Sequence, residues 1–420
     1  MLDRIAVAVF KQFVNVGTIT IRIADKRAIT CFGKHEGQHV EVTIQSKRIF
    51  REIVMRPDLA IGEAYMNGDL KIENNDLDAL MLFLMSNHKH WLKHWAGRAS
   101  LAISNQFAFM RHSNLLRASK RNVAHHYDLN DTLFDSFLDP RRQYSCAYYD
   151  DSSTTIEQAQ INKLARIAAK LNLQPQQHVL DIGCGWGGLA NALIDCEPET
   201  HVTGITLSER QLDFANKQRD LSGRQSQLDF HLRDYRHQTG DFDRIVSVGM
   251  LEHVGPTNYD TYFKTVRDLL KPKGVAMIHS IGVYMNPHPC NRWLAKYIFP
   301  GGYLPSLEQM VKSISKQGLK ILDVEIMRDH YAETLAQWRL RFRANIDAIR
   351  NDYDDRFIRM WEFYLVGCEC FFRVQEGMVF QFQLAHDHTA VPLARNYITN
   401  RQKIYRDILC KTAPFGNINS

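Results

Sequence analysis

The sequence predicts an α/β fold, in which a mostly parallel sheet is covered by helices on both faces and a small α+β domain precedes it. From residue 156 onward, apolar runs of strand length alternate with segments of helical periodicity, a pattern that builds parallel sheets. A glycine-dense turn follows the first of these strands. The N-terminal part instead holds short β-branched runs separated by glycines. With 420 residues, the chain is long enough for two domains, each with its own core.

The small domain is predicted to begin with a helix. Apolar residues recur at helical spacing from Leu2 to Val16, and Gly17 is predicted to end this helix. Strands are predicted at 18–23, 29–32 and 40–44, followed by a helix at 77–85. Between residues 88 and 121, basic residues alternate with tryptophan and phenylalanine, which suits a solvated linker or the headgroup layer of an anionic bilayer. We place a domain boundary here and predict domains over 1–110 and 111–420.

The larger domain shows regular alternation. A helix is predicted at 156–171, and strands are predicted at 178–182, 201–205, 229–232, 242–248 and 274–281. The carboxyl ends of such parallel strands meet at one edge of the sheet, where open α/β sheets bind their ligands. Candidate site residues are therefore expected just after these strands.

Composition and charge narrow the class of protein. The net charge of +6 suits an anionic membrane surface or has no particular role. Eight scattered cysteines without metal-ligand spacing indicate reduced thiols and no metal site. The N-terminus does not resemble a signal or transit peptide, and the longest uncharged apolar stretch, 79–85, is too short to span a bilayer. We expect a cytoplasmic protein with only peripheral membrane contact.

The strongest local motif is the turn after the first strand of the sheet, in which Asp181 precedes Gly183, Gly185 and Gly187. Glycines allow a ligand to approach the backbone closely. The spacing differs from that of the dinucleotide fingerprint and resembles the first motif of class I S-adenosylmethionine methyltransferases, which have a Rossmann-like sheet. Further candidates follow the next two strands: Thr206, Leu207 and Gln211, then Tyr235 and Arg236. Taken singly, Thr206 and Ser208 could be helix caps and Tyr235 a packing aromatic.

Longer motifs extend the resemblance over almost the whole chain. They include 143–148, the Gly-Cys-Gly-Trp-Gly-Gly turn, 249–255, His125-His126-Tyr127-Asp128, 297–302, 364–368 and 62–68. In these motifs the chain resembles the cyclopropane-fatty-acyl-phospholipid synthases. The resemblance implies a methylene transfer from S-adenosylmethionine to the cis double bond of unsaturated phospholipid acyl chains, and it adds Tyr144 and Ser145 to the cofactor site. It also implies a homodimer, a bilayer surface as partner, and a small domain used for membrane docking or dimerisation.

The family's chemistry suggests roles for further residues. After methyl transfer to the alkene, a base must remove a proton from the added methyl group so that the ring can close. In the family this base is understood to be bound bicarbonate. The matching positions are Cys146, Glu252, His279, Tyr331 and the backbone of Ile281. A cysteine regarded as catalytic in the family corresponds to Cys368, for which a structural role is the alternative because nothing nearby in sequence lowers its pKa.

Other functions remain open at this point. A related enzyme could methylate or methylenate acyl chains, modify mycolic acids or methylate a small amine. A noncatalytic lipid-binding scaffold is an alternative from another class, although Asp181, Gly183, Gly185 and Glu252 are intact. A nucleic-acid methyltransferase is disfavoured, because no Asn-Pro-Pro-Tyr-like motif is present.

Overall fold

The structure is a computed structural model that describes residues 8, 10–24, 28–93 and 129–412, arranged in two compact units. The first comprises Met1–Arg111, Pro289–Pro300 and Leu335–Glu376, and the second His112–His288, Gly301–Thr334 and Gly377–Ser420. The predicted boundary at 110/111 and the motif 125–128 lie outside the described residues. Two segments that we assigned to the larger domain, 289–300 and 335–376, belong instead to the first unit.

The first unit contains a four-stranded sheet in the order β2-β1-β3-β4. β1 runs parallel to β3 and antiparallel to β2, and β4 is antiparallel to β3. Ile19, Ile21, Val40 and Val42 are buried at alternating positions, so one face of the sheet forms a core. The strands are β1 (Val16–Ile23), β2 (Ile29–Phe32), β3 (His35–Ile44) and β4 (Leu70–Ile72).

The helices of the first unit include two that the periodicity did not predict, α2 and α3. α3 starts with Pro57 in its first turn, where a missing N–H costs nothing. None of the helices in the described ranges is both long enough and apolar enough to cross a membrane. The helices are α2 (Lys47–Met55), α3 (Pro57–Met66), η1 (Glu73–Asn75), α4 (Leu77–Lys93), α12 (Arg292–Tyr297), α15 (Ile346–Ile349), α16 (Asp355–Val374) and most of α14 (His330–Ala344).

The role predicted for Gly17 is wrong. Residues 8 and 10–13 are helical, but β1 already begins at Val16. Gly17 lies within this strand at a φ of 76°, where the register with β3 shifts. A Cβ at this position would lie 2.3 Å from the carbonyl oxygen of Gln38. Glycine is therefore required by a β-bulge and not by a helix end.

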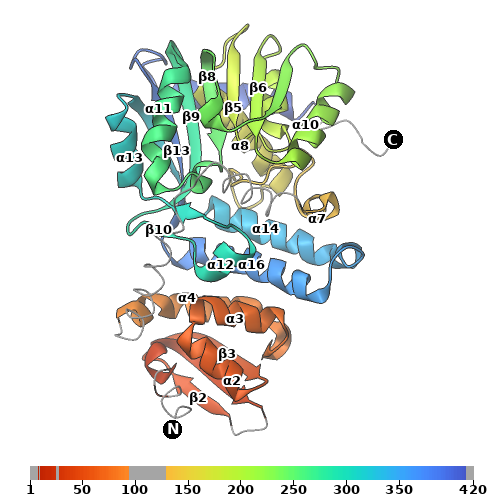
Figure 1. The fold of residues 1–420 in the computed structure, drawn as a ribbon, viewed down its shortest axis with the longest axis vertical. Helices are drawn as coiled ribbons and strands as arrows, with labels where there is room; N and C mark the ends of the chain where they lie inside the picture. The colour runs from red at the N-terminus through yellow and green to blue at the C-terminus, as the bar shows by residue number, and fades with distance from the viewer. Residues whose placement is uncertain (1–7, 9, 25–27, 94–128, 413–420) are drawn as a thin grey trace. The chain divides into compact units, whose positions relative to one another are not determined.

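The second unit is built on a seven-stranded sheet in the order β12-β13-β9-β8-β5-β6-β7, shown in Figure 1. Within this sheet, β13 runs opposite to all the other strands, which confirms the predicted mostly parallel sheet. The strands are β5 (His178–Ile182), β6 (His201–Thr206), β7 (Leu228–Leu232), β8 (Phe242–Val248), β9 (Leu270–Val283), β12 (Lys320–Met327) and β13 (Gly377–Ala385). Two short strands, β10 (His288–Pro289) and β11 (Tyr303–Leu304), lie outside this sheet.

Helices cover both faces of this sheet and create two apolar cores (Figure 1). Neighbouring residues of β5 face opposite cores: Val179 packs with α8, α9 and α17, and Leu180 packs with α11 and α13. Such burial on both faces explains the continuous apolar strands. The helices are α7 (Asp131–Asp135), α8 (Ile156–Leu171), α9 (Gly188–Cys196), α10 (Glu209–Leu221), η2 (Tyr235–His237), η3 (Leu251–His253), η4 (Pro256–Asn258), α11 (Tyr259–Leu269), α13 (Leu307–Lys316) and α17 (Asn396–Leu409).

Candidate active site

The glycine turn between β5 and α9 has a backbone shape that depends on glycine. Gly183, Gly185 and Gly187 have positive φ angles of 83°, 56° and 82°. The turn is fixed to β6, because the N–H groups of Gly183 and Cys184 both donate to the carbonyl of Ile205, at 2.9 and 3.0 Å. A Cβ on Gly185 would meet only the Nε2 of Gln211, at 3.8 Å. The turn is thus held from behind, while its backbone at Gly185 is open to a ligand.

Asp181, at the end of β5, is a buried carboxylate whose hydrogen-bonding capacity is not filled. Its side chain is 1% exposed, and Oδ2 has no hydrogen-bond partner among the described residues. Burial raises the pKa of Asp181 to about 7, although the positive charge of Lys163 opposes this. A buried acceptor without a partner is costly, so this oxygen is suited to a ligand that donates hydrogen bonds.

The end of β6 combines helix capping with a second ligand-binding candidate. Ser208 accepts from the N–H of Gln211 at 3.2 Å and caps α10, as the alternative interpretation expected. The hydroxyl of Thr206 donates to Oε1 of Gln211 at 3.0 Å. This contact leaves Nε2 of Gln211, the group nearest Gly185, as a donor beside the turn. Leu207 lies between these residues and is partly buried.

Tyr235 and Arg236 follow β7 and are held within the protein. The ring of Tyr235 is buried edge-to-face against Tyr262, with 5.3 Å between the centroids. The guanidinium of Arg236 forms a bidentate pair with Asp234, at 2.8 and 2.7 Å. Arg236 is therefore committed to Asp234, and direct contact of Arg236 with a cofactor stays a prediction.

The segment that carries Tyr144, Ser145 and Cys146 is fixed by a fully buried lysine. Lys163 of α8 donates to Oε1 of Gln143 at 2.6 Å and to the hydroxyl of Ser145 at 2.9 Å. Burial lowers the pKa of Lys163 to about 8, while the nearby carboxylates of Asp139 and Asp181 oppose this. These charge interactions link the glycine turn to the segment around Cys146. In the same segment, the aromatic ring of Tyr144 packs against Phe134 and Phe137.

Cys146 is a buried thiol in its neutral form. Its Sγ donates to the carbonyl of Ala147 at 3.4 Å. Burial raises the pKa of Cys146 well above its ordinary value, and the charge of Lys163 only partly offsets this. The next residue is anchored to α14, because the N–H of Ala147 donates to the hydroxyl of Thr334 at 3.0 Å. Cys146 is thus a weak hydrogen-bonding group and not a nucleophile.

Glu252 lies in η3, after β8, and reaches across to β9. Its Oε1 accepts from the N–H of Ile281 at 2.6 Å. Its Oε2 is buried and has no hydrogen-bond partner in the described part of the chain. Burial raises the pKa of Glu252 to about 7 against the hydrogen bond from Ile281. Because the N–H of Ile281 is engaged in this way, Ile281 positions Glu252, and Oε2 is the carboxyl oxygen left available to a ligand.

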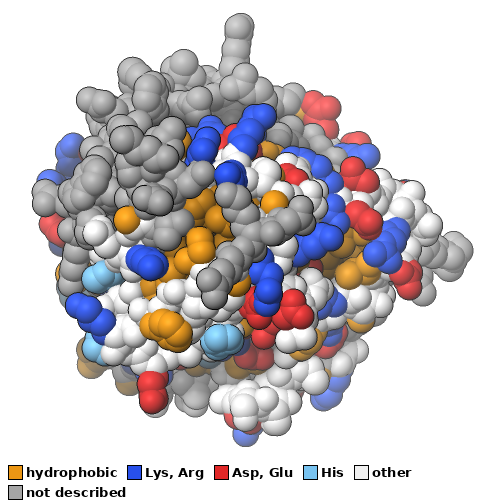
Figure 2. Space-filling model, turned by 90° about the horizontal axis from the view of Figure 1, so that it is seen from below, with side chains coloured by type: hydrophobic (Ala, Val, Ile, Leu, Met, Phe, Trp, Pro, Cys, Tyr) orange, Lys and Arg blue, Asp and Glu red, His pale blue; other side chains and the backbone are white. Residues whose placement is uncertain are grey.

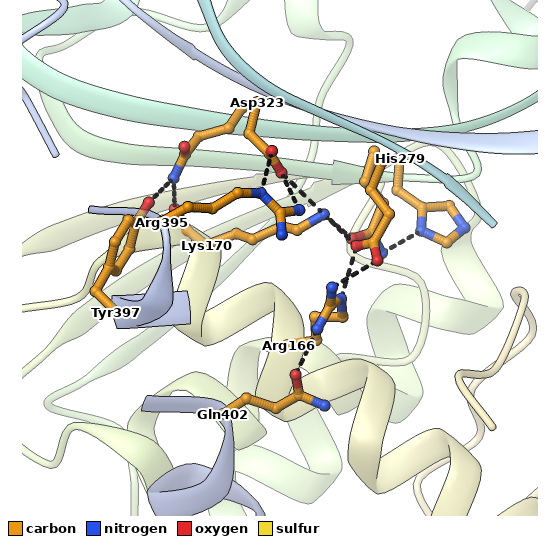
Figure 3. Close-up of polar contacts among 10 residues, drawn as sticks. Arg166, Lys170, His279, Asp323, Arg395, Tyr397 and Gln402 are labelled. Carbon is orange, nitrogen blue, oxygen red and sulfur yellow. Dashed lines mark hydrogen bonds and ion pairs between the residues drawn. The ribbon is translucent and has the colours of Figure 1, made fainter. Parts of the chain in front are cut away.

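His279 is a buried, neutral histidine on β9. Burial lowers the pKa of His279 to about 3, and the nearby charges of Lys163 and Lys170 lower it further. Its Nδ1 lies 3.1 Å from Nε2 of Gln381 on β13, and its carbonyl accepts from Gly249 at the end of β8 at 2.9 Å. Figure 3 shows this ring at the edge of a network of charged side chains, with its second nitrogen pointing away from the network.

Tyr331 and Cys368 were assigned by resemblance alone. Tyr331 is buried in the first turn of α14, three residues before Thr334, so it begins the helix that anchors the Cys146 segment. Cys368 lies on α16, in the first unit. Burial raises the pKa of the Cys368 thiol, with Cys290 and Cys370 adding to the effect. A thiol of this kind is not an activated nucleophile.

The polar residues behind the site were not predicted from the sequence. Lys163 and Lys170 lie seven residues apart in α8, both fully buried, and Gln381 is an equally buried residue of β13. The sequence did contain a signal for the buried lysines, since two lysines seven residues apart share one helix face. We interpreted that face only by its apolar residues.

Comparisons with known proteins show which proteins this chain is similar to. Residues 115–382 match the family model described as mycolic acid cyclopropane synthetase, and residues 7–95 match a domain of unknown function (DUF7884). The chain is 36% identical over 343 residues to the cyclopropane-fatty-acyl-phospholipid synthase of Escherichia coli K12, covering 81% of this chain and 86% of that protein. It is 32% identical over 349 residues to the tuberculostearic acid methyltransferase UfaA1 of Mycobacterium tuberculosis, covering 78% and 79%.

Among solved structures, the chain is again similar to cyclopropane synthases. The cyclopropane synthase MmaA2 from Mycobacterium tuberculosis is 32% identical with a TM-score of 0.60, covering 63% of this chain and 98% of that chain. The mycolic acid cyclopropane synthase CmaA1 complexed with SAH and CTAB is 33% identical with a TM-score of 0.59, covering 63% and 97%. The family match and the identity to the Escherichia coli enzyme show that this chain belongs to the mycolic acid cyclopropane synthetase family, enzymes with the class I methyltransferase fold.

Proposed function

We propose that this enzyme transfers a methylene unit from S-adenosylmethionine to the cis double bond of an unsaturated acyl chain in a membrane phospholipid, forming a cyclopropane ring. The observation that carries the proposal is Glu252, which is fixed by Ile281 and presents a buried, unpartnered oxygen beside the cofactor turn. Met250, two residues before Glu252, would contact a Cβ on Gly183 at 3.0 Å. This proximity supports placing the carboxyl group and the glycine turn in one site.

The residues of the glycine turn fit S-adenosylmethionine. The open backbone at Gly185, the donor Nε2 of Gln211 and the unpartnered Oδ2 of Asp181 supply complementary polar groups around one turn. When bound, the cofactor supplies an electrophilic methyl group on a sulfonium. The solved structure of CmaA1 is a complex with SAH, which supports placing the cofactor at the glycine turn here.

We also propose that bicarbonate occupies the space faced by Cys146, Glu252, His279 and Tyr331 and supplies the base for ring closure. Glu252, with its pKa raised to about 7, is able to hold a proton at Oε2 and donate it to an anion. His279 is neutral and offers a ring N–H. The S–H of Cys146 is donated to the carbonyl of Ala147, so this side chain would line the space without supplying a further donor. Glu252 and His279 would orient the anion, and the burial of these groups excludes water from it.

The deciding experiment uses the purified full-length chain, vesicles of unsaturated phospholipid and methyl-labelled S-adenosylmethionine. We expect acyl chains to gain the mass of one CH₂ group in a product that resists mild hydrogenation, and we expect turnover to fall when bicarbonate is removed from the buffer. Glu252→Gln should lower kcat by about 100-fold or more, while the exposed Glu199→Gln serves as the matched control.

Each alternative gives a different experimental result. A methyl-branched or hydrogenation-sensitive product would identify a fatty-acyl methyl- or methylenetransferase. Equilibrium dialysis without cofactor binding would identify a lipid-binding scaffold. Turnover that does not depend on bicarbonate would remove the anion from the proposal and leave the methylene transfer in place.

We further propose that the enzyme works at a bilayer surface as a homodimer. The first unit exposes large apolar side chains, with Phe32 76% and Met55 73% exposed, and Figure 2 shows exposed hydrophobic and basic side chains side by side on the face that it draws. Such a combination suits an anionic bilayer surface. Flotation with anionic vesicles should capture the chain and should weaken in Phe32→Ser/Met55→Ser, and analytical ultracentrifugation tests the dimer.

A further inference from the structure

A chain of three buried side chains ends at His279. Lys170 of α8, Gln381 of β13 and His279 of β9 are each 2% exposed or less. Gln381 and His279 are directly opposed cross-strand partners in the sheet. Nζ of Lys170 lies 2.8 Å from Oε1 of Gln381, and Nε2 of Gln381 lies 3.1 Å from Nδ1 of His279. The sheet register therefore places the amide between an ammonium group and an imidazole ring.

The donor and the acceptor of each of these hydrogen bonds can be assigned in only one way. An ammonium group has donors and no acceptor, so Lys170 must donate to the amide oxygen of Gln381. This fixes the orientation of the amide, whose NH₂ group then faces His279. Because an amide NH₂ only donates, Nδ1 of His279 must accept. A neutral imidazole that accepts at Nδ1 carries its proton on Nε2.

The positive charge of Lys170 is itself held in place by carboxylates. Its Nζ lies 2.6 Å from Oε2 of Glu325 and 3.7 Å from Oδ2 of Asp323. Arg166 contacts both oxygens of Glu325, at 2.6 and 2.5 Å, and Arg395 pairs with Asp323 (Figure 3). Buried charges persist when they are paired and hydrogen-bonded in this way. The network therefore keeps Lys170 fixed as a donor.

We propose that Lys170 and Gln381 are positioning residues that lock His279 in its Nε2–H tautomer, so that His279 serves as a hydrogen-bond donor to the reacting site and not as a base. Its Nε2 points away from the charged network (Figure 3). With the proton already on Nε2, that nitrogen has no lone pair with which to accept another proton. This inference rests on the proposed function only for the identity of the acceptor, a carbonate-type oxyanion.

The tautomer is measurable without any assay of activity. Long-range ¹H–¹⁵N correlation spectra of ¹⁵N-histidine-labelled protein distinguish protonated from unprotonated ring nitrogens, and the signals of His279 are identified by their loss in His279→Asn. We expect an unprotonated Nδ1 and a protonated Nε2 in the full-length enzyme. A wild-type His279 that carries its proton on Nδ1, or on both nitrogens, overturns the inference.

Substitutions of Gln381 test the coupling to turnover. In Gln381→Glu the carboxylate can only accept, so the proton should move to Nδ1 and kcat should fall roughly 10- to 100-fold, with the KM for S-adenosylmethionine within about twofold of wild type. Gln381→Met should populate both tautomers. Gln383→Met is the matched control, because Gln383 is buried on the same strand but bonds Tyr397 and the carbonyl of Lys170.

The outcomes separate this inference from the proposed function. If Gln381→Glu changes neither the tautomer nor kcat, the inference is wrong. If the enzyme forms cyclopropane rings while His279 carries its proton on Nδ1, only the inference fails. If His279 is the Nε2–H tautomer but no ring is formed, the proposed function fails and the assignment of the tautomer stands.

Discussion

Replacing Glu252 with glutamine should stabilise the folded enzyme at neutral pH while it removes activity. The pKa of Glu252 rises from 4.5 to about 7 on folding, chiefly through burial. Each tenfold change in proton affinity corresponds to about 1.4 kcal/mol, so ionising this buried carboxyl costs the folded state about 3 kcal/mol. Glutamine keeps the acceptor for the N–H of Ile281 without bringing a charge.

The sign of the effect follows from the raised pKa. Below 4.5 the carboxyl is protonated in both the folded and the unfolded state, and the folded state has its full stability. Between 4.5 and about 7 the unfolded chain releases the proton while the folded chain retains it, so stability is lost as the pH rises. Glu252→Gln abolishes this loss. Its advantage over wild type should grow by about 2–3 kcal/mol from about pH 5 to about pH 8.

Urea denaturation of wild type, Glu252→Gln and Glu199→Gln at both pH values measures this difference. Glu199 is an exposed carboxylate of the same unit, so its replacement should leave the pH dependence of the unfolding free energy as in wild type. If Glu252→Gln shows the wild-type pH dependence, Glu252 is not held in a site that disfavours its charge. The electrostatic reasoning for the anion site would then be wrong.

Three further predictions concern Lys163, Asp181 and Cys368. Lys163→Met leaves the oxygens of Gln143 and Ser145 without their donor and should lower the unfolding free energy by about 2–4 kcal/mol, measured in urea. Asp181→Asn should weaken S-adenosylmethionine binding roughly 10- to 100-fold by calorimetry; unchanged affinity would remove Asp181 from the cofactor site. Cys368→Ala should retain kcat within about threefold, because the raised pKa of this thiol disfavours a nucleophilic role; a loss of about 100-fold or more would restore the catalytic assignment.

The sequence pattern predicted the second unit well because its elements are buried on both faces. The predicted bounds of α8, β5 and β8 agree with the structure, since strong apolar runs ended by turn residues determine these elements locally. β9 extends from Leu270 to Val283, beyond the predicted 274–281. The extra length at the start depends on pairing with β8, which carries a register shift there. Such pairing is a tertiary interaction, and the local sequence gives no signal of it.

Site residues could be predicted from the sequence only where they belong to a contiguous motif. The glycine turn and Glu252 stand in contiguous motifs that a single sequence displays. Gln381 acquires its role because β13 inserts antiparallel beside β9 and brings it opposite His279. Long-range pairing of this sort cannot be read from periodicity. The same limit explains why segments 289–300 and 335–376 were assigned to the wrong unit.

The arrangement of charges around the site fits the demands of the proposed reaction. Methyl transfer to an alkene creates a positive charge on the acyl chain, and cationic side chains in direct contact would oppose it. Lys163 donates to the neutral side chains of Gln143 and Ser145, and Lys170 donates to Gln381, which lies between it and His279. His279, with its pKa lowered to about 3, faces the site without charge. The neutral amide of Gln381 thus relays hydrogen-bond polarity from Lys170 to His279 and would keep the positive charge of that lysine one side chain away from the proposed carbocation.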